Sequence, residues 1–367
     1  MTSEGVSRFK QHGHRRALII ASLGVMTAIS AIGVLYLNAG GVSFKDIVKI
    51  LLGIDEGIAS IDRTIVLTAG VPRILSCILA GFALGIAGAV MQCVLKNPLG
   101  SPYTLGVSNA AAFGASIGIV LLGGGTILGQ SGAEINISNP YIVAGSAFVW
   151  AMIATMVIVA LVKVTKVSPE TMVLAGVALS SIFSAGISLL QYIYNEYALS
   201  TIVFWQFGSM GKATIEELTM IAIVAAAICL YFLYNRLDYN ALDTGDDVAA
   251  SVGVNVERLR IISLVLSALL TAVVVSFMGI VAFIGLLGPH IVRRLVGNDH
   301  RYLLPGSMLL GALILLISDC VGQNLMDFTL PVGIITSFLG GPLFLYLLVM
   351  GYRKKNGRLK EFISRRQ

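Results

Sequence analysis

The stretch KNPLGSPYTLGVSN, residues 96–109, places two prolines and two glycines at the junction of two strongly apolar runs, 69–94 and 104–123. Proline lacks the backbone N–H that a helix needs and glycine relaxes the chain, so these residues separate one helix from the next. About 20 apolar residues are enough to cross a bilayer as a helix. The stretch therefore predicts a turn at the end of a membrane span, where the only charge is that of Lys96.

The composition extends this prediction to the whole chain. Of the 367 residues, 56% are hydrophobic and 12% are charged, and the mean hydropathy is +0.88. Such a chain cannot present the polar surface of a water-soluble globular domain. The apolar runs are centred on 18–37, 69–94, 104–123, 141–162, 172–192, 218–234, 261–278, 280–296, 303–319 and 333–351. We predict an all-α polytopic membrane protein with ten transmembrane helices.

The distribution of basic residues orients these spans, because cytoplasmic loops collect lysine and arginine. With the N-terminus inside, the outer segments contain Lys45, Lys49, Arg63, Arg73 and Lys212, and the rest of the 25 lysines and arginines lie inside. Both termini are therefore expected to be cytoplasmic. We expect one transmembrane domain, 18–351, with a cytoplasmic loop at 235–260, between a basic N-terminus, 1–17, and a basic tail, 352–367. The basic inner face suits anionic lipid, so the charge does not require a nucleic-acid partner.

Motifs for catalysis and for cofactors are missing from the sequence. It contains no GxxxxGK[ST] phosphate loop, no CxxC pair and no nucleophile–base pair in a polar context. We therefore expect no catalytic residues, no metal site and no cofactor. His12 and His14 in the basic N-terminus could bind a metal, but two exposed histidines usually do not. Cys77 and Cys320 could both lie near the outer face, where a disulfide is the less favoured alternative to simple packing.

Three glycines in the run 69–94 predict close helix packing. Gly81, Gly85 and Gly88 lie three or four residues apart, on one helical face. Small residues at this spacing let helix backbones approach closely in a membrane. Internal packing is favoured over a dimer face.

The loop NRLDYNALDTGDDVAASVGVNVERLR, residues 235–260, is long and carries charges of both signs. It is predicted to form one or two short helices broken at Gly245 and Gly253. A folded cytoplasmic segment between two spans is a natural docking site for a soluble partner. The alternative is a solvated loop without a partner.

At this point the chain resembles a known family, the permease subunits of type II ABC importers for iron siderophores, haem and vitamin B12. The resemblance runs from about Ser43 to Tyr352. It is carried by VPRIL at 71–75, GAVMQCVLKNPLGSPYTLGVSNAAAFGA at 88–115, LAGVALS at 174–180, FWQFGSM at 204–210, VGVNVERLR at 252–260, GIVAFIGLLGPHIVRRLVGNDHRYLLPGSMLLGA at 279–312, SDCVGQ at 318–323 and LPVGIITSFLGGPLFLYLL at 330–348. Eight such segments in one order, together with ten spans, are a specific match.

The resemblance implies a multi-pass permease of the inner or plasma membrane that pairs with an identical or related second permease subunit. Two ATP-binding subunits would lie beneath this pair and an extracytoplasmic substrate-binding protein above it. ATP hydrolysis would take place on the separate ATPase subunits, so the chain itself is not expected to be an enzyme.

The resemblance also implies positions for the inner gate. The family's Asn-Pro-Leu lies at the inner mouth of the transport path, which makes Asn97 and Leu99 candidate gate residues. A capped turn without a gating role is an equally good interpretation of the local sequence. Ser168 and Pro169, in KVSPET, resemble the other part of the gate, although the local match is poor.

The family pattern also implies where the ATPase subunits are contacted. The helices that make this contact match Val252, Gly253, Val254 and Arg258. Arg258 could instead simply mark the inner boundary of a span.

On the outer face, Arg73 matches an arginine that binds glutamates of the binding protein, and Arg63 could assist it. Gly70 and Gln323 stand where the family often has further arginines, so docking here departs from the pattern. Arg73 could instead be an interfacial anchor of its span.

The expected function is inward transport of a metal chelate by alternating access. An ion-coupled secondary transporter is one alternative, but it would need ionisable groups in mid-membrane, and these are scarce here. An ABC permease for another small substrate, such as free zinc or manganese, is a second alternative. A membrane scaffold without an ATPase partner is a third.

Overall fold

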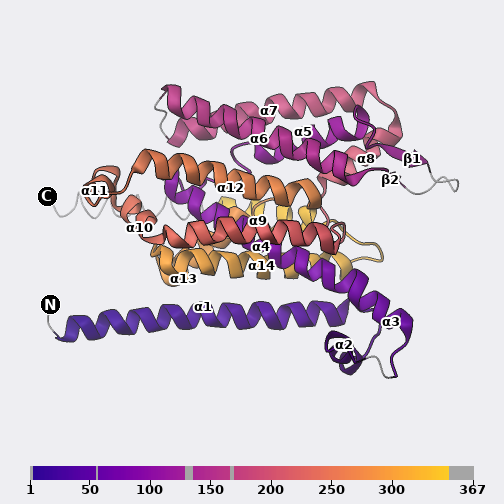
Figure 1. The fold of residues 1–367 in the computed structure, drawn as a ribbon, viewed down its shortest axis with the longest axis horizontal. Coiled ribbons are helices and arrows are strands. Elements are labelled where there is room, and N and C mark those ends of the chain that lie inside the picture. Colours follow the sequence, from indigo (N-terminus) through magenta and orange to yellow (C-terminus); the bar gives the residue numbers. More distant parts are fainter. Residues whose placement is uncertain (1–2, 55–56, 129–134, 166–168, 347–367) are drawn as a thin grey trace.

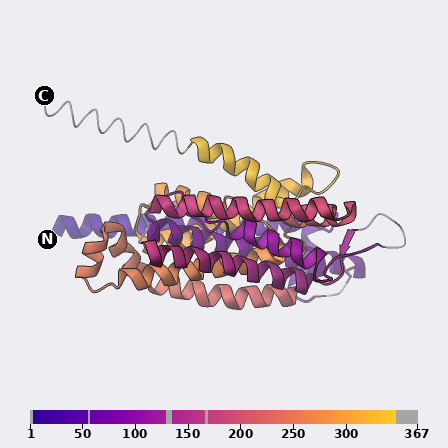
Figure 2. The ribbon, with the colours of Figure 1, turned by 90° about the horizontal axis from the view of Figure 1, so that it is seen from above.

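The computed structural model describes residues 3–54, 57–128, 135–165 and 169–346. Its long helices run nearly parallel and form one elongated bundle (Figures 1 and 2). The elements of the first half are α1 (Ser3–Leu37), α2 (Phe44–Leu51), α3 (Ser60–Thr64), the π-helical turn η1 (Ile65–Gly70), α4 (Val71–Val94), α5 (Val107–Val120), β1 (Thr126–Leu128), β2 (Ile135–Ile137), α6 (Pro140–Thr165) and α7 (Pro169–Ile193). Those of the second half are α8 (Glu196–Gln206), α9 (Ile215–Tyr234), α10 (Arg236–Thr244), α11 (Asp246–Ser251), α12 (Val256–Met278), α13 (Ile284–Val296), α14 (His300–Asn324) and a further apolar helix, Val332–Tyr346.

Every apolar run predicted from the sequence coincides with one of these helices. Seven helical stretches of the described chain are long and apolar enough to cross a membrane. The runs at 104–123, 280–296 and 333–351 correspond to shorter helices, namely α5, α13 and Val332–Tyr346. The prediction of a largely helical, multi-pass membrane protein is confirmed. Seven of the ten predicted spans correspond to described helices of full length, and the number of ten stays a prediction.

α4 lies at the centre of the bundle. Most of its side chains are buried, and it packs against α14, α12, α13 and α9. A methyl group on Gly81 or Gly85 would collide with the backbone of α14, and one on Gly88 would collide with the backbone of α13 at Gly285. The three glycines therefore serve internal packing, as predicted. Backbone contact of this kind holds helices together where lipid supplies no hydrophobic drive for association.

The two ends of the bundle differ in structure. α10 and α11 lie at the end where α1 begins, whereas α2, α3 and the β1–β2 hairpin lie at the opposite end (Figure 1). The two strands pair antiparallel, with Thr126 opposite Ile137, and they were not expected from the sequence. We call these the α10 end and the α2 end.

The four cysteines of the chain are free. Cys77 is buried on α4 and Cys320 is partly buried on α14. The disulfide considered as an alternative is therefore not formed, and both residues act as small packing side chains.

Candidate functional site: a turn and a helix pair joined by ion pairs

The connection from α4 to α5, residues Leu95–Gly106, forms a compact turn that we call the 95–106 turn. Lys96 has a positive φ of 48°, and the Asn97 side-chain oxygen accepts a hydrogen bond of 2.9 Å from the Leu99 backbone N–H. Thr104 accepts a hydrogen bond from Ser101 N–H and donates one to the Leu99 carbonyl. The turn is thus held by its own side chains. Asn97 and Leu99 are half-buried within it.

The segment between α9 and α12 contains two short helices, as predicted. α10 ends before Gly245, which has a φ of 137°, and α11 is followed by Gly253, which has a φ of 94°. A side chain built on Gly253 would meet open space, so glycine is required there by the backbone and not by packing. Both predicted breaks are confirmed. We call residues 236–255 the α10–α11 segment.

The four predicted coupling positions lie together at the α10 end. Val252, Gly253, Val254 and Arg258 line one open groove of about 370 Å³. Tyr231 of α9 and Asn235, which follows α9, also border it. Val252 is 67% exposed, which is unusual for a valine outside a lipid-facing helix. Exposed apolar groups beside an exposed arginine suit contact with another protein.

Asp246, at the start of α11, connects the α10–α11 segment to the 95–106 turn. Its carboxylate lies 2.9 Å from Lys96 Nζ and 3.1 Å from Arg260 Nη2. Arg260 also donates a hydrogen bond of 2.9 Å from Nε to the Val94 carbonyl, at the end of α4. Partial burial raises the pKa of the Asp246 carboxyl, but the hydrogen bonds and charges of Lys96 and Arg260 outweigh this and lower its pKa. Asp246 therefore ties the start of α11 to the 95–106 turn and to the end of α4.

A second polar cluster lies near the α2 end, between α4 and α14. Arg73 donates from Nε and Nη2 to the two carboxylate oxygens of Asp319, at 2.8 and 3.0 Å. Gln323 donates to the same carboxylate at 2.6 Å. The Asp319 side chain is 3% exposed and that of Arg73 is 21% exposed. Arg73, predicted to contact a binding protein, thus already has a bidentate partner within the chain.

The remaining predicted site residues lie elsewhere. Arg63 is on α3, at the α2 end. Ser168 lies outside the described residues, and Pro169 is the first residue of α7. The structure therefore places the predicted coupling positions in one groove and joins their segment to the turn with Asn97 and Leu99. Of the second part of the predicted gate it describes only the backbone at Pro169.

Sequence reasoning missed three of the groups that organise these clusters. Asp246 and Arg260 lie in the quoted loop, and alternating charges there were the available signal. Asp319 is 246 positions from Arg73, and a carboxylate within an otherwise apolar run was the signal for it.

Comparisons with known proteins agree with this architecture. A family model described as the FecCD transport family matches residues 23–350. A protein of Methanocaldococcus jannaschii named as an ABC transporter permease is 41% identical over 348 residues, covering 95% of this chain and 98% of that protein. The Fe(3+)-citrate import system permease of Bacillus subtilis is 33% identical over 345 residues, covering 92% and 96%.

A solved structure supports the same relationship. It is described as an inward-facing conformation of a metal-chelate type ABC transporter, and it is 28% identical to this chain. The two align with a TM-score of 0.76, over 91% of this chain and 99% of that chain. Because the family model and these relatives match nearly the whole length of the sequence, this multi-pass protein of the cell membrane belongs to the FecCD transport family.

Proposed function

We propose that the chain is the permease subunit of an ABC importer that moves a metal chelate inward across the cell membrane. The observation that carries the proposal is the ion-paired link from the exposed α10–α11 segment, through Asp246, to the 95–106 turn. A permease without an ATPase of its own needs such a route from a surface contact to a gate. The relatives named for Fe(3+)-citrate import and metal-chelate transport support the substrate class.

The proposed topology has ten membrane-crossing helices and a cytoplasmic α10 end. The shorter helices α5, α13 and Val332–Tyr346 would cross together with the seven long ones. The domain 18–351 would lie between the two basic termini, 1–17 and 352–367. The positive-inside rule supports this orientation.

The groove at Val252, Gly253, Val254 and Arg258 is proposed as the contact for an ATPase subunit. ATP hydrolysis would take place on that subunit. Closure of two ATPase subunits would push on α11, and Asp246 would carry the movement to Lys96 and Arg260.

The inner gate is proposed at Asn97 and Leu99, with Ser168 and Pro169 on the facing part. The side-chain bonds inside the 95–106 turn make it a unit that can shift without unfolding. Alternating access then means that this gate and an outer gate are open in different states, and that ATP binding changes the population of each.

On the outer face, Arg63 and Arg73 are proposed to meet acidic groups of a substrate-binding protein. Because Asp319 binds both Nε and Nη2 of Arg73, an incoming glutamate would have to share that guanidinium.

The proposed functional unit is a pair of permease subunits, identical or related, with the path between them. In the described spans, carboxylates such as Glu217 and Asp319 lie towards helix ends rather than in mid-membrane. This distribution supports an ATP-driven importer over an ion-coupled transporter.

The proposal is tested by co-expressing the chain with its chromosomal neighbours, purifying the complex and measuring ATP hydrolysis in liposomes. Loaded candidate binding proteins are expected to stimulate hydrolysis. Gly253→Trp should abolish the stimulation, because it strains a positive φ and fills the groove. Gly41→Trp is the matched control, because Gly41 also has a positive φ, of 95°, and open space around it, but precedes α2 at the other end.

If no ATPase subunit co-purifies under mild detergent conditions, the importer assignment fails. Equal loss of stimulation in both tryptophan variants would contradict the groove as the specific contact surface.

A further inference from the structure

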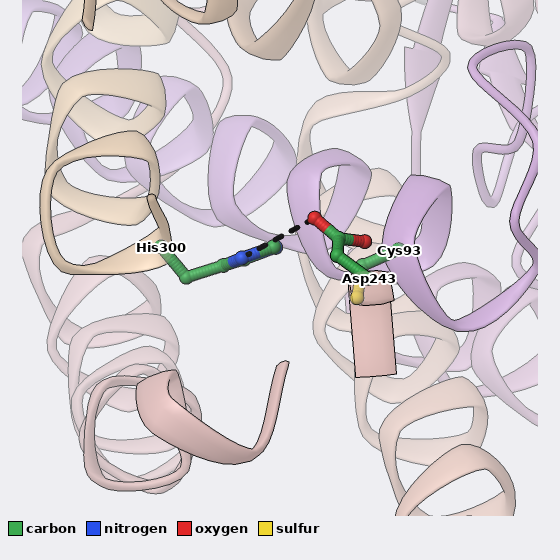
Figure 3. A group of neighbouring side chains, drawn as sticks. All are labelled: Cys93, Asp243 and His300. Carbon is green, nitrogen blue, oxygen red and sulfur yellow. Dashed lines mark ion pairs between the residues drawn. The ribbon is translucent and has the colours of Figure 1, made fainter. Parts of the chain in front are cut away.

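Three side chains that commonly bind transition metals meet at the α10 end of the bundle. Cys93 comes from the last turn of α4, Asp243 from the last turn of α10 and His300 from the first turn of α14. Figure 3 shows the three pointing toward one another, and one ligand atom from each lies within 4.8 Å of the others. Neither the ion-paired link nor the proposed gate uses these groups.

Two of the three residues are buried and the third reaches the surface. Cys93 is 1% exposed and His300 is 0% exposed, while the Asp243 side chain is 23% exposed. The interior groups are therefore shielded from water. The exposed edge of Asp243 leaves an entry path from the aqueous side.

One nitrogen of the buried histidine ring lacks a hydrogen-bond partner within the described part of the chain. His300 Nδ1 lies 3.0 Å from the Asn240 side-chain oxygen and 3.7 Å from the Asp243 carboxylate. That Asn240 oxygen already accepts the His300 backbone N–H at 2.8 Å. One ring nitrogen carries at most one hydrogen, and Nε2 has no partner among the described residues.

The thiol has two polar contacts. Cys93 Sγ lies 3.5 Å from the Tyr239 carbonyl, to which it can donate, and it also hydrogen-bonds the Asp243 side chain. Sulfur, nitrogen and oxygen donor atoms therefore meet in a space that is largely shielded from water. A cation bound there would displace the thiol proton and be held by one atom from each residue.

The donor set and spacing suit a divalent ion of intermediate softness. Zinc binds cysteine sulfur, histidine nitrogen and carboxylate oxygen at about 2.0–2.3 Å in tetrahedral geometry, which places neighbouring donor atoms about 3.3–3.7 Å apart. The His300–Asp243 separation of 3.7 Å falls at the edge of that range. Ferrous and cobaltous ions accept similar ligands.

We propose that Cys93, Asp243 and His300 bind a zinc-like divalent transition-metal ion that fastens α10 to the ends of α4 and α14. A water molecule would complete the coordination on the exposed side. Asn240 supports the site from outside, because it bonds both the His300 backbone and the Asp299 carboxylate. Such outer contacts fix the orientation of metal ligands.

The site has a consequence for transport, and this part rests on the proposed function. α10 belongs to the segment proposed to contact the ATPase, so a metal that ties α10 to two spans would restrain the coupling movement. An importer of metal chelates would then be slowed by the metal ion that accumulates on its α10 side.

Cobalt titration of the purified full-length chain tests the site. The protein is prepared without a histidine tag and in a His12→Ala, His14→Ala background, so that terminal histidines do not contribute. We expect one Co²⁺ per chain, a thiolate-to-cobalt charge-transfer band and displacement of the band by Zn²⁺. Cys93→Ser should abolish the band, and Asp243→Asn should weaken cobalt affinity by about tenfold or more.

Cys229→Ser is the matched control, because Cys229 is another buried free thiol but lies on α9. It should keep the band. The metal site is ruled out if the parent protein shows no band, if Cys93→Ser keeps it, or if Cys229→Ser loses it. If Cys93→Ser fails to fold, the Asp243→Asn variant decides, because the Asp243 side chain lies partly at the surface and its replacement should be tolerated. Unchanged cobalt affinity in Asp243→Asn contradicts the site.

The consequence is tested separately, as inhibition by Zn²⁺ of stimulated ATP hydrolysis in the complete transporter, relative to each variant without zinc. Inhibition in the parent that is lost in Asp243→Asn supports the restraint. A cobalt band without zinc inhibition contradicts the restraint alone, and failure to assemble with an ATPase contradicts the proposed function, because the titration of the single chain does not depend on it.

Discussion

The two ends of the bundle use ion pairs in different ways. At the α10 end, Asp246 is 45% exposed and is shared between Lys96 and Arg260, which belong to different segments. Near the α2 end, Asp319 is 3% exposed and binds one guanidinium through both oxygens. Exposed pairs are weak and exchange readily, whereas buried bidentate pairs resist separation. The comparison indicates a movable joint at one end and a fixed clamp near the other.

The largest effect is expected from breaking the buried ion pair between Arg73 and Asp319. Arg73→Ala leaves the buried Asp319 carboxylate without its cation, and breaking a buried pair from one side costs about 3–5 kcal/mol of stability. Thermal unfolding in detergent measures this loss. The double variant Arg73→Met, Asp319→Leu should recover most of it, because no buried charge remains. A double variant as unstable as Arg73→Ala would contradict the clamp.

Loss of the exposed ion pairs of Asp246 should change stability little but coupling strongly. Asp246→Asn is expected to lower the free energy of unfolding by at most about 1 kcal/mol, as for exposed ion pairs. In the complete transporter it should reduce stimulated ATP hydrolysis by at least about fivefold, the lower end of ordinary coupling energies. Asp247→Asn is the matched control, since Asp247 is the neighbouring aspartate on α11. Equal effects of both variants would argue against Asp246 as the link.

High salt should weaken the exposed ion pairs of Asp246 but not the buried pair of Arg73 and Asp319. At about 1 M salt the screening length falls to about 3 Å, so the exposed contacts of Asp246 lose most of their strength. The small stability difference between the parent and Asp246→Asn should therefore vanish in high salt. The difference caused by Arg73→Ala should persist, because its pair is buried. Thermal unfolding at low and high salt provides both values.

The smallest effect is the pH dependence of the joint. Asp246 has a pKa lowered by Lys96 and Arg260, while in the unfolded chain it titrates near the ordinary value of 3.8. Its ion pairs therefore stabilise the fold fully above that value, and the contribution is lost as pH falls through the lower folded pKa. Asp246→Asn should flatten this part of the stability profile. An unchanged profile in the variant would mean that other carboxylates dominate the acid response.

The helical architecture could be predicted because the membrane restricts the choices. Backbone groups in lipid must bond within a helix or a closed barrel, so apolar runs of sufficient length identify helices. The breaks in the α10–α11 segment could be predicted because glycine readily adopts a positive φ, and Gly245 and Gly253 both do. The close packing of α4 followed from the spacing of its glycines.

Other features depend on contacts that a linear pattern does not reveal. α13 begins after Phe283, a non-glycine residue with a φ of 66°, so its short length was not visible in the apolar run. β1 and β2 have three residues each, too few to show an alternating pattern. The Arg73–Asp319 pair and the Cys93 cluster join residues that are far apart in sequence, and only the fold brings them together.

The backbone contacts of α4 with α13 and α14 bear on which variants of this protein would be dominant. Where glycine faces backbone, as at Gly81, Gly85 and Gly88, no bulky chelate can pass between these helices. In the proposed pair of permease subunits, the path for such a cargo would run along surfaces contributed by two chains. In a homodimer, a variant that folds and assembles but does not respond to the ATPase would inactivate the normal copies with which it pairs. Alleles such as Gly253→Trp should accordingly be dominant when both forms are expressed in one cell, whereas alleles that prevent folding should be recessive.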